Sequence, residues 1–277
     1  QMIQTFENAS CFHTSNWAKV ICESYGYQPT YFIHHDDFGP SAVMPVISIN
    51  SMLTGRRGVS LPFTDFCDPL INGKCRFEKI LTSIIEYGKQ LKWRHIEFRG
   101  NTNCFPESVF SENFLTHRVK LCSDVDKLFA GFRSSTCRNI RKAEKLGVEV
   151  QIDSSPNFLQ TFFKLNCLTR RQHGLPPQPF KFFKNLHKYL ISDELGKVVI
   201  ATYKGQPVAG AVYLNFGKKA IYKYGASDSR FNNLRANNLM MWEAIKWYAR
   251  QNYTELHMGR TEPAHTGLDQ YKSGWNT

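Results

Sequence analysis

Two stretches near the C-terminal end of the chain decide the fold: Thr254–Thr261, which reads TELHMGRT, and Gly267–Trp275, which reads GLDQYKSGW. The first alternates as a strand does and ends at a glycine and an arginine. The second places Gly267, where a backbone can approach a ligand closely, ahead of the aromatic and cationic pair Tyr271 and Lys272. A strand that ends in Gly-Arg and precedes such a pair predicts the edge of a binding cleft.

The elements that lead into this strand have a counterpart in the first half of the chain. Residues 236–251 carry apolar side chains at i, i+4 and i+7, and residues 76–91 repeat that helical spacing. A short strand follows each helix, and in the first half it ends at Arg99-Gly100. The repetition predicts an internal duplication.

β-rich runs precede both of these helices. In the first half, residues 30–35 and 42–49 are separated by a turn that contains Gly39-Pro40. In the second half, three runs separated by Gly-containing turns predict a meander over 197–203, 208–214 and 220–224.

Each half therefore has the order helix, strands, helix, strand, with opening helices predicted over 14–24 and 156–172. This order predicts an α/β (α+β) protein of two units with mixed sheets that arose by duplication. The predicted units are residues 1–130 and 150–277, and a basic helix within 131–149 forms the junction between them.

The net charge of +12 is uneven along the chain. Residues 1–150 hold 18 Lys/Arg against 15 Asp/Glu, a balance of +3, and residues 151–277 hold 17 against 8, a balance of +9. The second half is the candidate binder of phosphates, nucleic acid or a nucleotide-bearing donor. The alternative is a basic surface that only confers solubility.

Cysteine usage and hydropathy indicate the compartment. The eight cysteines include no Cys-x-x-Cys pair and are expected to be reduced thiols in a cytoplasmic protein without a metal site. No apolar stretch approaches the roughly 18 residues of a membrane-spanning helix, and the beginning of the chain does not resemble a signal peptide. The oligomeric state is left open.

Five arginines are candidate ligands for an anionic substrate. Arg138 and Arg141 are three residues apart and share one face of the junction helix. Arg230 and Arg235 flank the loop between the third meander strand and the long helix, and Arg260 ends the last strand. The alternatives are a solvated helix flank at the junction, and a plain helix cap by an asparagine of the loop.

Two carboxylates lie among aromatic residues in the segment 60–69, which reads SLPFTDFCDP. Asp65 is the candidate residue for orienting an attacking amine or accepting its proton. Asp68 precedes a proline and is favoured as a turn former.

In order and spacing, these segments resemble the Fem-type transferases, which build peptidoglycan cross-bridges, within the GNAT-like acyltransferases. The loop at Arg230 departs from the glycine-rich coenzyme A cradle of GNAT enzymes, and no coiled-coil arm is present. The resemblance rests on Arg138–Glu144, Thr169–Pro176, Tyr224–Ala226, Arg230, Gly259–Thr261, Gly267–Gly274 and, in the first half, Leu61–Asp65.

The resemblance implies two GNAT-like units around a shared cleft. It implies acyl transfer to an amine acceptor without a covalent enzyme intermediate, from an aminoacyl-tRNA or acyl-coenzyme A donor and without a resident cofactor. Lys272 would stabilise the developing oxyanion, Tyr271 would pack on the donor end, and Asp65 would serve the acceptor amine.

A rival interpretation is a non-catalytic protein that binds RNA or another anionic polymer on a GNAT-like scaffold. Such a protein needs dispersed basic and aromatic side chains, whereas an acyltransferase needs a defined cation and a residue for the acceptor amine. Lys272 and Asp65 therefore distinguish the two interpretations.

Overall fold

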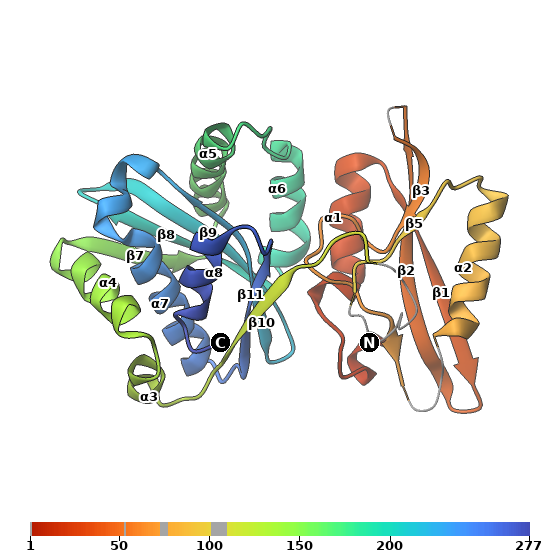
Figure 1. The fold of residues 1–277 in the computed structure, drawn as a ribbon, viewed down its shortest axis with the longest axis horizontal. Coiled ribbons are helices and arrows are strands. Elements are labelled where there is room, and N and C mark those ends of the chain that lie inside the picture. Colours follow the sequence, from red (N-terminus) through yellow and green to blue (C-terminus); the bar gives the residue numbers. More distant parts are fainter. Residues whose placement is uncertain (1, 53, 73–76, 101–109) are drawn as a thin grey trace. The chain divides into compact units, whose positions relative to one another are not determined.

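Two mixed β-sheets organise the chain, one in each of two units (Figure 1). The computed structural model describes residues 2–52, 54–72, 77–100 and 110–277, so that Cys75, Cys104 and the first residue of the predicted 76–91 helix lie outside it. Unit 1 comprises Gln1–Phe110 and unit 2 comprises Ser111–Thr277.

The sheet of unit 1 has the order β1-β2-β3-β5, with β4 paired to β2. The first three strands are antiparallel, and β5 pairs with β3 in parallel after the crossover helix α2. Ile80 and Ile84 of α2 are buried with Ala42, Met44 and Val46 of β2. The elements are η1 (Met2–Thr5), η2 (Cys11–His13), α1 (Ser15–Tyr25), β1 (Gln28–Asp36), β2 (Gly39–Ser51), β3 (Gly55–Val59), β4 (Leu70–Ile71), α2 (Glu78–Gln90) and β5 (Ile96–Glu97).

The sheet of unit 2 has the order β6-β11-β10-β9-β8-β7. Helix α5 packs against β8, β9 and β10, whereas α7 packs against β7, β8 and β9, and α4 packs against α7 and β7 (Figure 1). The elements are β6 (Leu115–Lys120), α3 (Val125–Ala130), α4 (Ser134–Lys145), β7 (Val148–Asp153), α5 (Pro156–Gln172), α6 (Phe180–Leu186), η4 (His187–Ile191), β8 (Gly196–Tyr203), β9 (Gln206–Phe216), β10 (Lys219–Ser227), η5 (Ser229–Leu234), α7 (Ala236–Arg250), β11 (Glu255–Thr261) and α8 (Thr266–Ser273).

Both units contain the same succession of an antiparallel three-strand meander, a crossover helix and a strand parallel to the third. In unit 1 the succession is β1-β2-β3-α2-β5, and in unit 2 it is β8-β9-β10-α7-β11. The predicted fold class of two α/β units with mixed sheets is confirmed.

Strands β3, β4, β6 and β7 and the helix α8 were not predicted from the sequence. Strands β3, β6 and β7 are short, and β6 pairs with β11, so that it belongs to the sheet of unit 2 although it lies within the predicted first unit. The junction helix is α4, which also packs within unit 2. From the sequence alone, the stretch from the end of the last strand to Tyr271 was interpreted as a glycine-containing loop; that interpretation is wrong around Gly267, which lies in the first turn of helix α8.

Six of the eight cysteines lie in the described part of the chain, and they are free thiols: Cys11, Cys22, Cys67, Cys122, Cys137 and Cys167. Among the described residues, no helix combines the length and the apolar character needed to cross a bilayer.

Candidate active site

The parallel strands β10 and β11 separate halfway along their length. They pair only from Lys219–Ile221 to Glu255–His257, although β10 continues to Ser227 and β11 to Thr261. Irregular register in β10 against β9, and in β11 against β6, begins where the two strands part. Ligands of open α/β sheets bind at the carboxyl ends of such strands, because the parting strands leave space and free backbone groups there.

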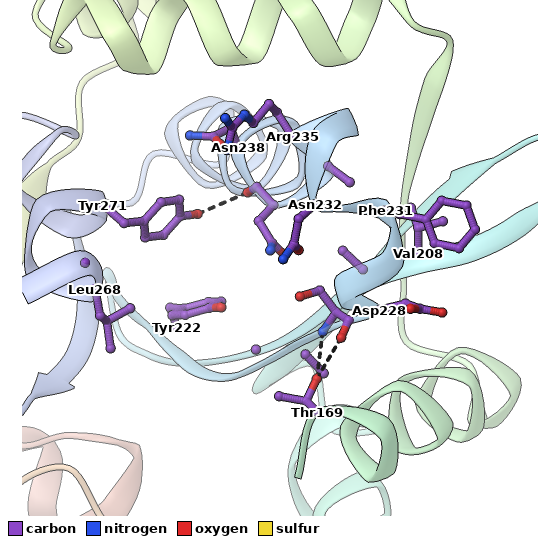
Figure 2. Close-up of a pocket in the computed structure, with 17 residues that line it drawn as sticks. Thr169, Val208, Tyr222, Asp228, Phe231, Asn232, Arg235, Asn238, Leu268 and Tyr271 are labelled. Carbon is purple, nitrogen blue, oxygen red and sulfur yellow. Dashed lines mark hydrogen bonds between the residues drawn. The ribbon is translucent and has the colours of Figure 1, made fainter. Parts of the chain in front are cut away.

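A pocket of about 440 Å³ lies along the part of β10 that extends beyond this pairing, and β9, η5, α7 and α8 supply most of its other lining residues. In Figure 2, Tyr222 of β10 lies below it, Leu268 and Tyr271 of α8 lie at one side, and Asn232 lies towards the start of α7. The Tyr271 hydroxyl donates a hydrogen bond to the Asn237 carbonyl at 3.1 Å. This bond ties α8 to α7 and fixes the width of the pocket on that side.

The N-terminus of α7 opens into the pocket. A helix N-terminus presents N–H groups without helical partners and the positive end of the helix dipole, which together favour anions. Arg235 is the N-cap residue, is exposed and lines the pocket. The same region supplies the side-chain amides of Asn232 and Asn238.

Arg235 has a left-handed backbone, with φ of 61°. Glycine adopts this conformation without strain, whereas other residues pay about 1–2 kcal/mol. The loop lacks the glycines of a coenzyme A cradle, yet at Arg235 its backbone takes the left-handed conformation that glycine adopts most easily, and the side chain adds a guanidinium there. The expected asparagine cap of α7 is wrong, because no side chain caps this helix.

Thr169 of α5 holds the free end of β10. Its hydroxyl donates to the Ser227 carbonyl at 3.0 Å and accepts from the Ser227 N–H at 2.9 Å. The Asp228 N–H donates to the Val208 carbonyl of β9. In an antiparallel ladder, the backbone groups of successive residues point alternately towards and away from the partner strand, so those of Gly225 and Ser227 point away from β9. Thr169 thus satisfies both groups of Ser227 that no neighbouring strand reaches.

Asp228 and Arg230 form an ion pair at the rim of the pocket. The Arg230 guanidinium donates to both carboxylate oxygens, with Nη2 to Oδ2 at 2.5 Å, and the Asp228 carboxylate also accepts from the Arg230 N–H at 3.1 Å. The hydrogen bond from the Arg230 side chain lowers the pKa of Asp228. Arg230 remains 72% exposed, so one side of its guanidinium faces solvent.

The pocket tyrosines stay protonated at neutral pH. Burial raises the pKa of Tyr222 to about 12, and burial together with Tyr222 raises the pKa of Tyr271 well above its usual value. Both rings therefore offer neutral hydroxyls and flat apolar faces to a ligand.

Lys272 lies behind the pocket instead of in its lining. It is only 3% exposed, and its ammonium donates to the carbonyls of Gly259 and Arg260 at 3.4 and 3.0 Å. The ammonium therefore attaches α8 to the end of β11. Its predicted part in oxyanion stabilisation stays a prediction.

The remaining predicted residues are distributed over the chain. Arg235, Gly267 and Tyr271 come together in the pocket, and Arg230 lies beside it. Arg260 is exposed, with its guanidinium 4.4 Å from the Phe114 ring centre.

The other three lie on elements that do not line the pocket. Arg138 and Arg141 are exposed on α4, and Asp65 is half-buried in unit 1. Their assigned roles stay predictions.

The segment that holds Asp65 has an unusual backbone. Leu61 and Phe63 both have positive φ, 63° and 65°, which is uncommon for residues other than glycine. The Thr64 hydroxyl donates to the Leu61 carbonyl at 2.8 Å, and the Ser60 hydroxyl accepts from the Arg99 N–H at 2.8 Å. Strained backbones held in this way cluster at functional sites.

Sequence reasoning missed several pocket residues, including Thr169, Tyr222 and Asn238. Thr169 had a signal, because it begins one of the segments on which the family resemblance rests. Tyr222 and Asn238 had none, because strand and helix periodicity assigns both to ordinary core positions. Among the described residues, no group of three His, Cys, Asp or Glu side chains is arranged to hold a metal ion.

The model of a known family, the acetyltransferase (GNAT) domain, matches residues 130–273, just over half of the chain. The chain therefore belongs to the GNAT acetyltransferase family. Membership places it among the acyltransferases, as the sequence predicted.

Individual relatives narrow the resemblance to the Fem type. A UDP-N-acetylmuramoylpentapeptide-lysine N(6)-alanyltransferase of Weissella viridescens is 25% identical over 140 residues, an alignment that covers 50% of this chain and 41% of that protein. The chain thus matches less than half the length of this curated relative. The predicted resemblance to Fem-type proteins is confirmed.

Solved structures share the fold over nearly the whole chain. The crystal structure of FemX superposes with a TM-score of 0.73 at 14% identity, over 99% of this chain and 90% of that one. A tandem GNAT protein from the clavulanic acid biosynthesis pathway has a TM-score of 0.59 at 5% identity, over 91% and 80%. At these identities the likeness concerns the fold alone.

Proposed function

We propose that this protein is a Fem-like N-acyltransferase that transfers an aminoacyl group to the amine of a peptidoglycan precursor. The observation that carries the proposal is the pocket beside the part of β10 that extends beyond its pairing with β11, with the N-terminus of α7 and Arg235 at its edge. The named activity of the Weissella viridescens relative supports the acceptor class.

The reaction follows from the chemistry of this opening. The acceptor nitrogen attacks the carbonyl of the donor ester, a C–N bond forms, and the C–O bond of the ester breaks. The amine proton leaves with the departing hydroxyl. Gly225 directs its N–H towards the open edge of β10, where it can donate to the oxyanion of the intermediate.

An aminoacyl-tRNA is the favoured donor over an acyl-coenzyme A. Both carry phosphates that suit the start of α7 and the Arg235 guanidinium. A coenzyme A cradle, however, uses side-chain-free glycines where this chain has exposed Asn233 and Arg235. Lys272 as oxyanion cation and Asp65 as acceptor residue are part of this proposal and come from the family resemblance.

The test is transfer of alanine from alanyl-tRNA to a UDP-linked muramoyl-pentapeptide that carries a free lysine amine, compared in wild type and Arg235→Gly. The variant removes the charge and keeps the left-handed conformation without strain, so its melting temperature should not fall. Loss of one charge-assisted phosphate contact, about 1.5–3 kcal/mol, should lower kcat/KM by roughly 10- to 100-fold.

Arg250→Ala is the matched control, because Arg250 is an exposed arginine at the opposite end of α7. It should leave kcat/KM within about twofold, the range of an exposed substitution worth less than 0.5 kcal/mol. Absence of transfer by the wild-type protein with every aminoacyl-tRNA would refute the proposal. Coenzyme A binding at micromolar affinity would reverse the order of donors.

A further inference from the structure

We propose that the outward face of α4 is a docking surface for double-stranded RNA, the body of the donor whose acylated end enters the pocket. This inference rests on the proposed function, because the RNA is the proposed donor. It adds that a second surface of the protein, besides the pocket, recognises the double-stranded part of that donor. The surface consists of Arg138, Arg141, Lys142 and Lys145 and is called the α4 basic face.

The helix geometry gathers these four side chains on one side. Thr136, Ile140 and Ala143 are buried and fix the inward direction of α4. At about 100° per residue, the four basic residues project within about 55° of the opposite direction. All four are exposed. Because an α-helix rises about 1.5 Å per residue, these charges lie along about 10 Å of α4.

The charges on this face are not neutralised within the described part of the chain. None of the four basic residues forms an ion pair there, whereas Arg230, Lys197 and Lys246 each pair with a carboxylate. The nearest acidic residue on the helix is Glu144, which lies on its flank. An open row of cations beside so few anions attracts a polyanion and loses that attraction as salt rises.

The α4 basic face and the pocket belong to one connected part of unit 2. The Arg133 N–H, just before α4, donates to the Gly274 carbonyl at the end of α8 at 3.0 Å. The Arg133 guanidinium donates to the Ser273 hydroxyl at 3.4 Å. α4 also packs along α7, whose N-terminus borders the pocket (Figure 1). Two anion-binding surfaces on connected helices suit a long ligand with one reactive end.

The side chains favour RNA over an anionic membrane. Arginine forks match phosphate oxygens, and the Arg141 guanidinium is additionally placed 5.2 Å from the Phe129 ring centre. A helix that lies on a membrane needs large apolar residues to insert beside its charges. The exposed large apolar residue beside this face is Leu146, the C-cap residue that follows α4, at 40%.

The test compares two double variants with a matched control in direct binding of deacylated tRNA. The variants are Arg138→Gln/Arg141→Gln and Lys142→Gln/Lys145→Gln, and glutamine preserves helix propensity, so the fold is retained. The control is Lys164→Gln/Lys181→Gln, which removes two exposed lysines from α5 and α6. Each α4 variant should bind tRNA at least about 10-fold more weakly at low salt. Its plot of log binding constant against log salt concentration should be less steep by about two, while the affinity of the control should change by less than about twofold.

A second readout uses the reaction. The α4 variants should lower kcat/KM for full-length aminoacyl-tRNA more than for an aminoacylated oligonucleotide that has only the single-stranded 3′ end. Equal losses with both donors, or wild-type binding of tRNA by both variants, would overturn the docking proposal. Loss of binding to phosphatidylglycerol vesicles, with tRNA binding intact, would assign the face to a membrane instead.

Because deacylated tRNA needs no turnover, the binding result judges the α4 basic face even if the proposed transfer reaction is not observed. Conversely, an active enzyme whose α4 variants bind tRNA normally would leave the proposed function in place and remove only the docking surface.

Discussion

Replacement of Lys272 by methionine tests whether its buried ammonium stabilises the end of unit 2 where α8 meets β11. The ammonium is 3% exposed and donates to the Arg260 carbonyl at 3.0 Å and to the Gly259 carbonyl at 3.4 Å. Methionine fills a similar volume, so the main change is the loss of these bonds. Two buried carbonyls then lose a charged partner, at about 1–3 kcal/mol each for a good bond and less for the longer one.

Relief of the desolvated charge offsets part of this loss, so we expect a net cost of about 3 kcal/mol. For a unit of the size of Ser111–Thr277, each kcal/mol corresponds to roughly 2–4 °C, so the melting temperature should fall by about 6–12 °C. Calorimetry of the purified variant measures this directly. Lys181→Met, an exposed lysine on α6, is the control and should shift the melting temperature by no more than about 2 °C.

A shift for Lys272→Met that matches the control would refute the structural role. Turnover of the wild type and of Lys272→Met, measured well below both melting temperatures, then tests whether the ammonium also takes part in the reaction. If the ammonium also stabilises the oxyanion, kcat should fall by about 10²–10³ in the folded variant. An unchanged kcat would remove Lys272 from the chemistry and leave it as the attachment of α8 to β11.

Two further substitutions test the pocket. Thr169→Val removes both hydrogen bonds to Ser227. It should lower the free energy of unfolding by about 1–2 kcal/mol and raise KM for the donor, whereas Thr169→Ser should leave both quantities unchanged. Denaturant unfolding measures the first quantity and initial rates measure the second. Asp228→Asn tests the ion pair. Because the folded pKa of Asp228 lies below its unfolded value, its stabilisation is present above about pH 4 and disappears as the pH falls through the folded pKa. The difference in melting temperature between wild type and Asp228→Asn should therefore shrink on acidification from pH 6 to about pH 2, and a difference that stays constant would contradict the assignment.

The helices and long strands were predictable because their side chains repeat with the period of the element. The helix expected over 156–172 is α5, Pro156–Gln172, and the strand expected over 197–203 is β8, Gly196–Tyr203. The duplicated order of elements followed from the same periodicity. Strand β6 was not predicted because its residues are mostly polar and exposed, so that only its pairing with β11 identifies it as a strand.

The site was predictable in part. Arg235, Gly267 and Tyr271 were singled out because cations, glycines and rings suit an anionic ligand, and they line one pocket. The burial of Lys272 was not predictable, because composition does not reveal which carbonyls will enclose an ammonium. The left-handed backbone of Arg235 was not predictable either, since such strain depends on the packing of η5 and α7 around it.

The position of β11 has a consequence for how the protein is made. In the sheet order β6-β11-β10-β9-β8-β7, the strand synthesised last is inserted between the strand synthesised first and the rest. Until residue 261 has left the ribosome, β6 and β10 each expose an edge to other chains, and the pairing that closes the sheet spans more than 130 residues from Leu115 to Thr261. Such long-range pairing is slow and exposed to aggregation. We expect unit 1, whose pairings are all local to its own residues, to fold during synthesis, and unit 2 to complete its sheet only when the C-terminal strand has emerged.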